Sequence, residues 1–138
     1  MAVPPAATKK TPEGAEAFAR YYTEELDEAA ATSQTATLTQ LSMTTCETCQ
    51  NFISMLDGRS ARGEHGEKKS FELGAVQMDP SSPPGKPIVD VLVTDLGSRI
   101  VDKTGKVIEN SAPAKLNFRY TLNWSADSWR VADSEVVQ

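Results

Sequence analysis

The chain of 138 residues contains two cysteines, Cys46 and Cys49, separated by Glu47 and Thr48. This spacing places both sulfur atoms on one face of the first turn of a helix. Such a pair can form a short disulfide, act as a thioredoxin-type redox couple, supply half of a metal site, or remain as two reduced thiols in a cytosolic protein. Each alternative implies different chemistry or a different compartment.

The surrounding sequence favours the structural disulfide. A zinc site needs four ligands, and the chain has a single histidine, His65. A thioredoxin-like redox motif follows a strand in a βαβ unit, whereas the segment before Cys46 is expected to be helical. In an oxidising compartment, closing so small a loop stabilises a protein by about 2 kcal/mol on the chain-entropy model. We therefore expect a disulfide that holds the start of a helix.

The remaining candidates for acid–base chemistry are His65 and two aspartates. His65 is expected to lie in a charged, glycine-flanked loop, where it would be exposed to solvent. Asp90 and Asp95 fall in one valine-rich strand, but their odd separation points them to opposite faces, so they do not form a carboxylate pair. No histidine falls on the face of a predicted helix or strand that would point into the domain, which counts against catalysis.

The N-terminal half of the chain predicts helices. Thr11, Pro12 and Glu13 form a strong helix start, with a hydroxyl cap, a proline at the first position and an acid near the dipole. The helix that follows carries one apolar stripe at spacings of three and four: Ala15, Phe18, Ala19, Tyr22, Leu26 and Ala29. A shorter helix is expected over 35–41, and a third begins after a cap at Thr44 or Thr45.

From residue 69 onward the pattern changes to strands. Extended runs over 71–78, 88–96, 115–124 and 129–137 are separated by turn residues. Gly97 is expected to bend the second run onward to residue 102, residues 107–108 to pair back briefly, and 109–113 to form a loop. These elements predict an α+β domain over 11–138, with N-terminal helices packed on a curved antiparallel sheet of about four strands. Residues 1–10 read as a flexible linker.

A curved sheet and a straight helix cannot touch everywhere, so a pocket between them is expected. The candidate lining residues are aromatic: Phe18, Tyr22, Phe52, Tyr120 and Trp124. The same side chains could equally be core. Tyr22 and Tyr120 are the favoured pocket residues, because a buried hydroxyl needs a partner that a small, largely apolar ligand or water can supply.

The formal net charge of −5 excludes most nucleic-acid partners, which require a basic surface. The sequence contains no run of about 20 consecutive apolar residues, the length that a helix needs to cross a bilayer. We expect no metal and no cofactor.

The order of elements, with the chain end Tyr120-Thr121-Leu122-Asn123-Trp124 followed by Trp129-Arg130-Val131, resembles the nuclear transport factor 2-like, SnoaL-like (cystatin-like) cone. A closer resemblance is to secreted actinobacterial lipoproteins of unknown function, carried by the segment from Thr11 to Tyr22, by Cys46-Glu47-Thr48-Cys49 and by the final hairpin. This resemblance implies a lipidated leader before Ala2, a location outside the cytoplasm at the cell surface, and contact with a membrane only through that lipid anchor. It supplies no catalytic residues.

Together these observations predict an extracytoplasmic, non-catalytic binding or interaction domain of a surface lipoprotein. Two alternatives stay open: an isomerase- or dehydratase-type enzyme that uses the cone pocket, and a thiol-disulfide oxidoreductase centred on Cys46 and Cys49. A homodimer through the outer face of the sheet is also considered, but the sequence leaves the oligomeric state open.

Overall fold

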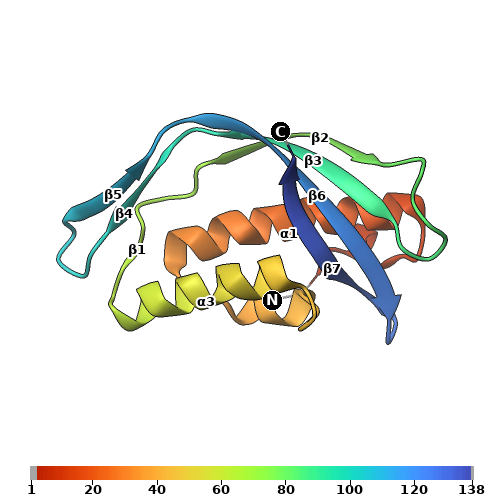
Figure 1. The fold of residues 1–138 in the computed structure, drawn as a ribbon, viewed down its shortest axis with the longest axis horizontal. Helices are drawn as coiled ribbons and strands as arrows, with labels where there is room; N and C mark the ends of the chain where they lie inside the picture. Colours follow the sequence, from red (N-terminus) through yellow and green to blue (C-terminus); the bar gives the residue numbers. More distant parts are fainter. Residues whose placement is uncertain (1–2, 138) are drawn as a thin grey trace.

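A computed structural model describes residues 3–137 as three helices packed against the concave side of an antiparallel sheet (Figure 1). The helices are α1 (Pro12–Thr32), α2 (Ala36–Leu41) and α3 (Glu47–Ala61). The main sheet has the order β2-β3-β6-β7 and consists of β2 (Phe71–Met78), β3 (Ile88–Asp95), β6 (Ala114–Ser125) and β7 (Ser128–Val137). The predicted α+β architecture is confirmed.

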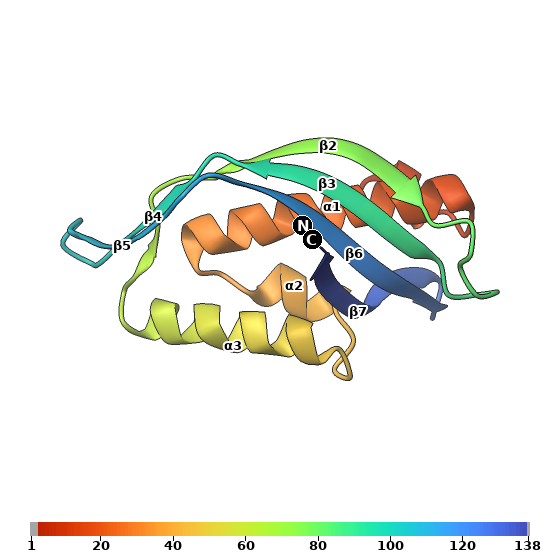
Figure 2. The same cartoon turned by 45° about the horizontal axis from the view of Figure 1, so that its top comes forward.

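A second, three-stranded sheet extends from one end of the main sheet. It has the order β1-β4-β5 and consists of β1 (His65–Gly66), β4 (Ser98–Val101) and β5 (Val107–Ser111). In both ribbon views β4 and β5 project beyond the end of α1 (Figure 2). Two expectations are wrong here: His65 lies in a short strand rather than a loop, and residues 109–111 continue β5 rather than leaving the sheet.

The start of α1 is the one that the sequence predicts. The Thr11 hydroxyl accepts a hydrogen bond from the Gly14 N–H at 2.9 Å, with Pro12 in the first helical position. The helix ends at Ser33, whose left-handed backbone (φ 57°) lets its N–H donate to Ala29 O. The apolar stripe of α1 faces the sheet, and Phe18 and Tyr22 are almost fully buried there.

The concave face of the main sheet carries the apolar residues of the period-two pattern. Val89, Val91 and Val93 of β3 are buried, and Tyr120 of β6 pairs with Val89 in register. Register shifts interrupt β2 after Leu73 and β6/β7 after Thr121. Such irregularities bend strands, which accounts for the curvature of the sheet around α1.

Gly97 turns the chain from β3 into β4, as expected. Its φ is +93°, and a Cβ atom there would approach Ser111 O to 3.0 Å, so both the backbone conformation and the close packing require glycine.

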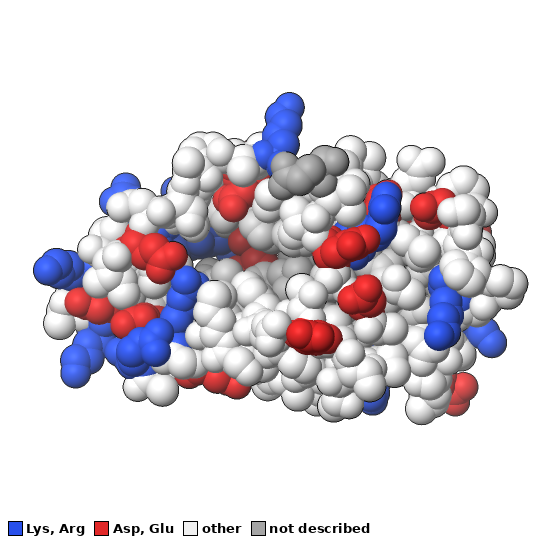
Figure 3. Space-filling model, viewed as in Figure 1, with Lys and Arg blue, Asp and Glu red and all other residues white. Residues whose placement is uncertain are grey.

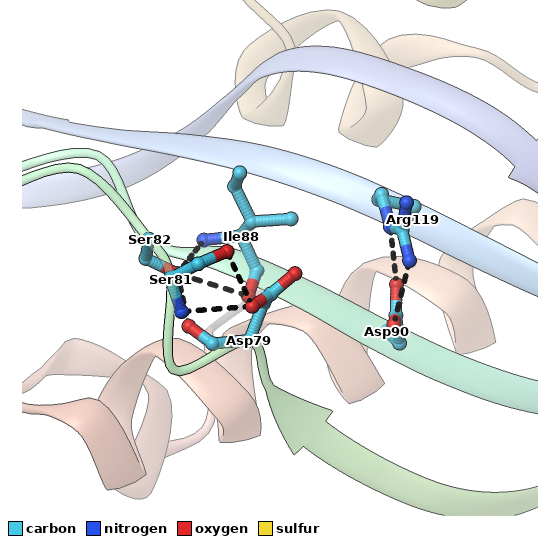
Figure 4. Close-up of polar contacts among 6 residues, drawn as sticks. All are labelled: Asp79, Ser81, Ser82, Ile88, Asp90 and Arg119. Atoms are coloured by element: carbon cyan, nitrogen blue, oxygen red, sulfur yellow. Dashed lines mark hydrogen bonds and ion pairs between the residues drawn. The ribbon is translucent and has the colours of Figure 1, made fainter.

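The β2–β3 connection is an ordered turn (Figure 4). Asp79 Oδ1 accepts hydrogen bonds from the Ser81 N–H at 2.8 Å and the Ser81 hydroxyl at 2.7 Å. Ser82 Oγ donates to Asp79 O and accepts from the Ile88 N–H, which joins the two ends of the turn. These bonds explain how a proline-rich segment closes a hairpin.

The segment expected to be a flexible linker packs on the domain over the part that the structure describes. Pro5–Thr8 form a short 3-10 helix, η1, in which Ala7 is 2% exposed. The indole Nε1 of Trp129 donates to Lys9 O at 2.8 Å. Met1 and Ala2 of the predicted linker lie outside the described residues. Burial of Ala7 against the core holds this segment, a contact that its Pro- and Ala-rich composition does not reveal.

Candidate functional site

Cys46 and Cys49 form a disulfide at the first turn of α3, with 5.2 Å between their Cα atoms. Cys46 is itself the helix cap, because its Sγ accepts a hydrogen bond from the Cys49 N–H at 3.2 Å. The expected cap at Thr44 or Thr45 is therefore wrong by one or two residues. Cys46 is 0% exposed and Cys49 3% exposed. Thiol–disulfide exchange needs an attacking thiolate to reach a sulfur atom, so this burial disfavours the oxidoreductase alternative.

A cavity of about 170 Å³ opens between the helices and the second sheet. Figure 3 shows the surface hollowed between α3 and the strands above it. The apolar part of its wall includes Leu26, Phe52, Phe71 and Ile100, and the charged part comes from Asp27, Arg59, Lys68, Asp95 and Glu109. Pockets for drug-sized ligands span roughly 300–1,000 Å³, so this volume suits only a small ligand.

Two of the three carboxylates in the cavity wall support the backbone. Asp27 accepts hydrogen bonds from the N–H groups of Ser70 at 2.8 Å and Phe71 at 3.2 Å, which joins α1 to the start of β2. Asp95 Oδ1 accepts from the Gly97 N–H at 2.9 Å, where the chain turns into β4.

The third carboxylate pairs with a cation: Glu109 lies 3.5 Å from the Arg59 guanidinium. A general base needs a carboxylate that is free to take the substrate's proton. Each of the three carboxylates thus has a partner within the protein.

Three of the predicted pocket residues lie together, but in the core. Phe18, Tyr22 and Tyr120 are at most 1% exposed, and the Tyr22 and Tyr120 rings meet edge-on with centroids 5.2 Å apart. The Tyr22 hydroxyl pairs with Ser42 Oγ at 2.8 Å, and that of Tyr120 pairs with Thr23 Oγ1 at 2.7 Å. Burial raises the pKa of both tyrosines, and each hydrogen bond opposes that rise. Protein partners thus satisfy the hydroxyls for which a ligand or water was expected.

The other two predicted pocket residues lie apart. Phe52 of α3 lines the cavity, whereas Trp124 packs edge-on against Trp129 near the β6–β7 turn, with ring centroids 5.0 Å apart. Of the five predicted pocket residues, Phe52 alone lies on the wall of this cavity.

The sequence analysis did not select Asp27, Arg59 or Glu109. Asp27 reaches N–H groups 43 and 44 residues away, and Arg59 meets Glu109 across 50 positions of sequence. No local spacing signals such contacts, so only a contact map could have found them.

The residues considered for acid–base chemistry lie outside the cavity or at its wall. Asp90 and Arg119 form a bidentate ion pair on the outer face of the sheet, with N–O distances of 2.9 and 3.2 Å (Figure 4). Asp90 therefore points away from the helices, whereas Asp95 reaches the cavity wall. His65 is exposed, as expected.

Within residues 3–137, no three His, Cys, Asp or Glu side chains gather in a group that could hold a metal ion. None of the helices described has the length and apolar composition that a membrane span requires.

Comparison with known families gives a match along almost the whole chain. Residues 2–135 match a family of unknown function, DUF6318. The chain belongs to this family. A search of curated proteins finds no match to this DUF6318 sequence.

Solved structures show similarity to this DUF6318 domain at low sequence identity. The intermembrane space region of the chloroplast protein ARC6 has a TM-score of 0.69 at 11% identity, covering 94% of this chain and 98% of that one. The β subunit of benzoate 1,2-dioxygenase from Burkholderia mallei has a TM-score of 0.57 at 12% identity, covering 94% and 92%. Aln2 from a Streptomyces species has a TM-score of 0.55 at 9% identity, covering 87% of each chain. The last two are nuclear transport factor 2-like cones, which confirms the predicted fold class.

Proposed function

We propose that this protein is an extracytoplasmic, non-catalytic binding domain, displayed by a lipid-anchored precursor, that holds a small ligand in the cavity beside Phe52. The observation that carries the proposal is the buried Cys46–Cys49 disulfide, because disulfides persist in oxidising compartments. The disulfide suggests the compartment, and the engaged carboxylates of the cavity support binding rather than catalysis. The lipid anchor rests on the resemblance to secreted lipoproteins.

The compartment is tested in the native host. Cells are quenched in acid, fractionated, and treated with a maleimide-linked polymer before and after reduction. We expect the protein in the envelope fraction, with no gel shift before reduction and a two-thiol shift after it. A Cys46→Ala/Cys49→Ala variant is the control for labelling. Recovery of reduced thiols, or of the protein in the cytosolic fraction, overturns the placement.

The lipid anchor is tested in the same cells. An alkyne-tagged fatty acid is fed to the host, and the purified full-length protein is checked for the tag. Incorporation into the envelope-bound form is expected. A protein that reaches the envelope without the tag overturns the anchor alone.

The binding role is tested by filling the cavity. Phe52→Trp enlarges a side chain on the cavity wall, whereas Met55→Trp makes a similar enlargement on an exposed position of the same helix. Native mass spectrometry of protein from its own host should show a retained small molecule in the wild type and in Met55→Trp, and its loss in Phe52→Trp. The same spectrum reports whether the protein is a monomer or a dimer. A wild-type protein without ligand, or a ligand that both variants retain, overturns the binding role of this cavity.

A further inference from the structure

A groove lies at the end of the domain where α1 begins. The β2–β3 turn runs beside the start of α1 in both ribbon views (Figures 1 and 2), and the groove at this place has a volume of about 280 Å³. Most of its wall is apolar and includes Pro12, Met78, Pro83, Pro84, Pro87 and Trp129. None of the described residues that line it belongs to the cavity beside Phe52, and the proposed function does not use it.

The polar side chains of this wall, other than a lysine, already have partners within the protein. The Thr11 hydroxyl caps α1, and Ser82 Oγ joins the two ends of the β2–β3 turn. The indole N–H of Trp129 donates to Lys9 O. These bonds hold the wall in place, so the groove exists before any ligand binds. They also leave a ligand few side-chain groups with which to form hydrogen bonds.

The four prolines of the wall reduce the hydrogen bonding on offer still further. A proline has no backbone N–H, so it contributes hydrocarbon and a carbonyl acceptor but no donor. The carbonyl groups of an extended peptide would find few donors in such a wall, and burying them without a partner is costly. The groove therefore suits a ligand with a hydrocarbon body better than it suits a peptide.

The remaining polar group of the wall is the ammonium of Lys10. Lys10 is exposed, and it takes part in none of the ion pairs formed within residues 3–137. No acidic residue lines the groove in the part of the chain that the structure describes, and Glu13, three positions along the chain, is not part of the wall. Opposite charges attract more strongly beside an apolar surface than in bulk water. The charge of the wall is thus complementary to an anion.

We propose that this groove binds a small aliphatic monocarboxylate. Its hydrocarbon chain lies against Met78, Trp129 and the four prolines, and its carboxylate pairs with Lys10. The volume is slightly below the roughly 300 Å³ at which pockets for drug-sized ligands begin, so a short chain fits better than a long one. The proposal does not depend on the compartment or on the cavity beside Phe52.

The test is a titration of the ¹⁵N-labelled protein with sodium hexanoate, followed by NMR. We expect saturable shifts of the Trp129 indole N–H and of amides within residues 10–15 and 82–86. Hexanamide has the same chain without the charge and should bind about fivefold more weakly, the upper end for an exposed ion pair. Acetate has the charge with almost no chain and should cause no saturable shift.

The contact with Lys10 is tested by a pair of variants. Lys10→Gln should weaken hexanoate binding about fivefold. Lys9→Gln is the matched control: it removes the same charge from an exposed neighbour that does not line the groove, and screening by salt should keep its effect below about twofold. Phe52→Trp, which fills the other cavity, should leave hexanoate binding unchanged. Both lysines are exposed, so neither substitution threatens the fold.

Other occupants of the groove give different results. A proline-rich peptide blocked at both ends is titrated in parallel, and tighter binding of this peptide than of hexanoate overturns the proposal in favour of a partner protein. Shifts of the same signals when the protein alone is concentrated overturn it in favour of a second copy of this chain. Absence of saturable shifts with hexanoate, equal weakening by Lys9→Gln and Lys10→Gln, or loss of binding in Phe52→Trp also overturns it.

Discussion

Thr23 of α1 and Tyr120 of β6 share a hydrogen bond of 2.7 Å between hydroxyls that are both fully buried. Thr23 Oγ1 also lies 2.8 Å from Ala19 O, to which it donates its single proton. Tyr120 must therefore be the donor in the shared bond. This contact joins the helix to the sheet through polar groups inside an apolar core.

The direction of this bond predicts that removing the Tyr120 hydroxyl and removing the Thr23 hydroxyl lower the free energy of unfolding by different amounts. Tyr120→Phe leaves the Thr23–Ala19 bond intact and should lower the free energy of unfolding by about 1 kcal/mol. Thr23→Val leaves the Tyr120 hydroxyl buried without an acceptor and should cost about 2 kcal/mol. Urea unfolding measures both values. A larger loss for Tyr120→Phe than for Thr23→Val would contradict the assigned direction.

Removing the disulfide should destabilise the protein moderately. Cys46→Ala/Cys49→Ala opens a very short loop, for which the chain-entropy model gives a loss of about 2 kcal/mol in the free energy of unfolding. Reduction of the wild type should cause a similar loss, whereas the double variant should not respond to dithiothreitol. Unfolding curves with and without reductant decide this point. Equal stability of the two proteins under oxidising conditions would show that the bond does not support α3.

Asp27→Asn should weaken the junction between α1 and β2. The amide has one acceptor oxygen in place of two charged ones, so it cannot serve the N–H groups of both Ser70 and Phe71. We expect a loss of about 2 kcal/mol, because hydrogen bonds to charged acceptors exceed neutral ones. Hydrogen exchange of these two amides should also become faster.

Asp133→Asn is the control for this prediction. Asp133 is exposed on β7 and should tolerate the change within about 0.5 kcal/mol. If both variants lose the same stability, Asp27 has no special structural role.

Glu25, a largely buried residue of α1, should make stability depend on pH. Burial raises its pKa in the folded state, the charges of Glu28 and Glu24 raise it further, and Tyr21 and Lys69 act in the opposite direction. A raised folded pKa means that the folded protein binds the proton more tightly than the unfolded chain. The unfolded carboxyl loses its proton first as pH rises, so stability falls from the unfolded pKa up to the folded pKa and is constant above it.

Glu25→Gln removes the ionisable group, and with it the loss of stability that its ionisation causes in the folded protein. It should be more stable than the wild type at pH 7, by at most about 1 kcal/mol because solvent screens the carboxylate, and similar to it near pH 4. Urea unfolding at the two pH values measures the difference, and Glu24→Gln controls for a simple loss of charge. A Glu25→Gln variant that gains nothing at pH 7 would show that the ionised carboxylate is well accommodated.

Much of the fold could be predicted because its signals are local. The cap at Thr11 with Pro12, the turn at Gly97, and the alternation in β6 each depend on residues within a few positions of one another. The strands β2, β3, β6 and β7 follow from such patterns to within about one residue at most ends. The disulfide was also foreseen, because its two partners share one helical turn.

The candidate site could be predicted only in part, because its contacts are distant. Phe52 was selected for its aromatic character, whereas the engagement of Asp27 depends on where β2 begins, 43 residues later. The brief strand at His65 forms only because Val101 lies opposite. Neither feature has a local signature.

By itself, the sequence determined the order of helices and strands, the apolar face of each, and the cysteine pair that can close on itself, since all of these follow from spacing along the chain. Only the tertiary structure decided that the hydroxyls of Tyr22 and Tyr120 find hydrogen-bond partners within the core. It also decided that the cavity opens beside Phe52 instead. The reason is physical: whether a buried polar group meets a protein partner or a ligand depends on atoms brought together by packing, and packing joins residues that are far apart in sequence.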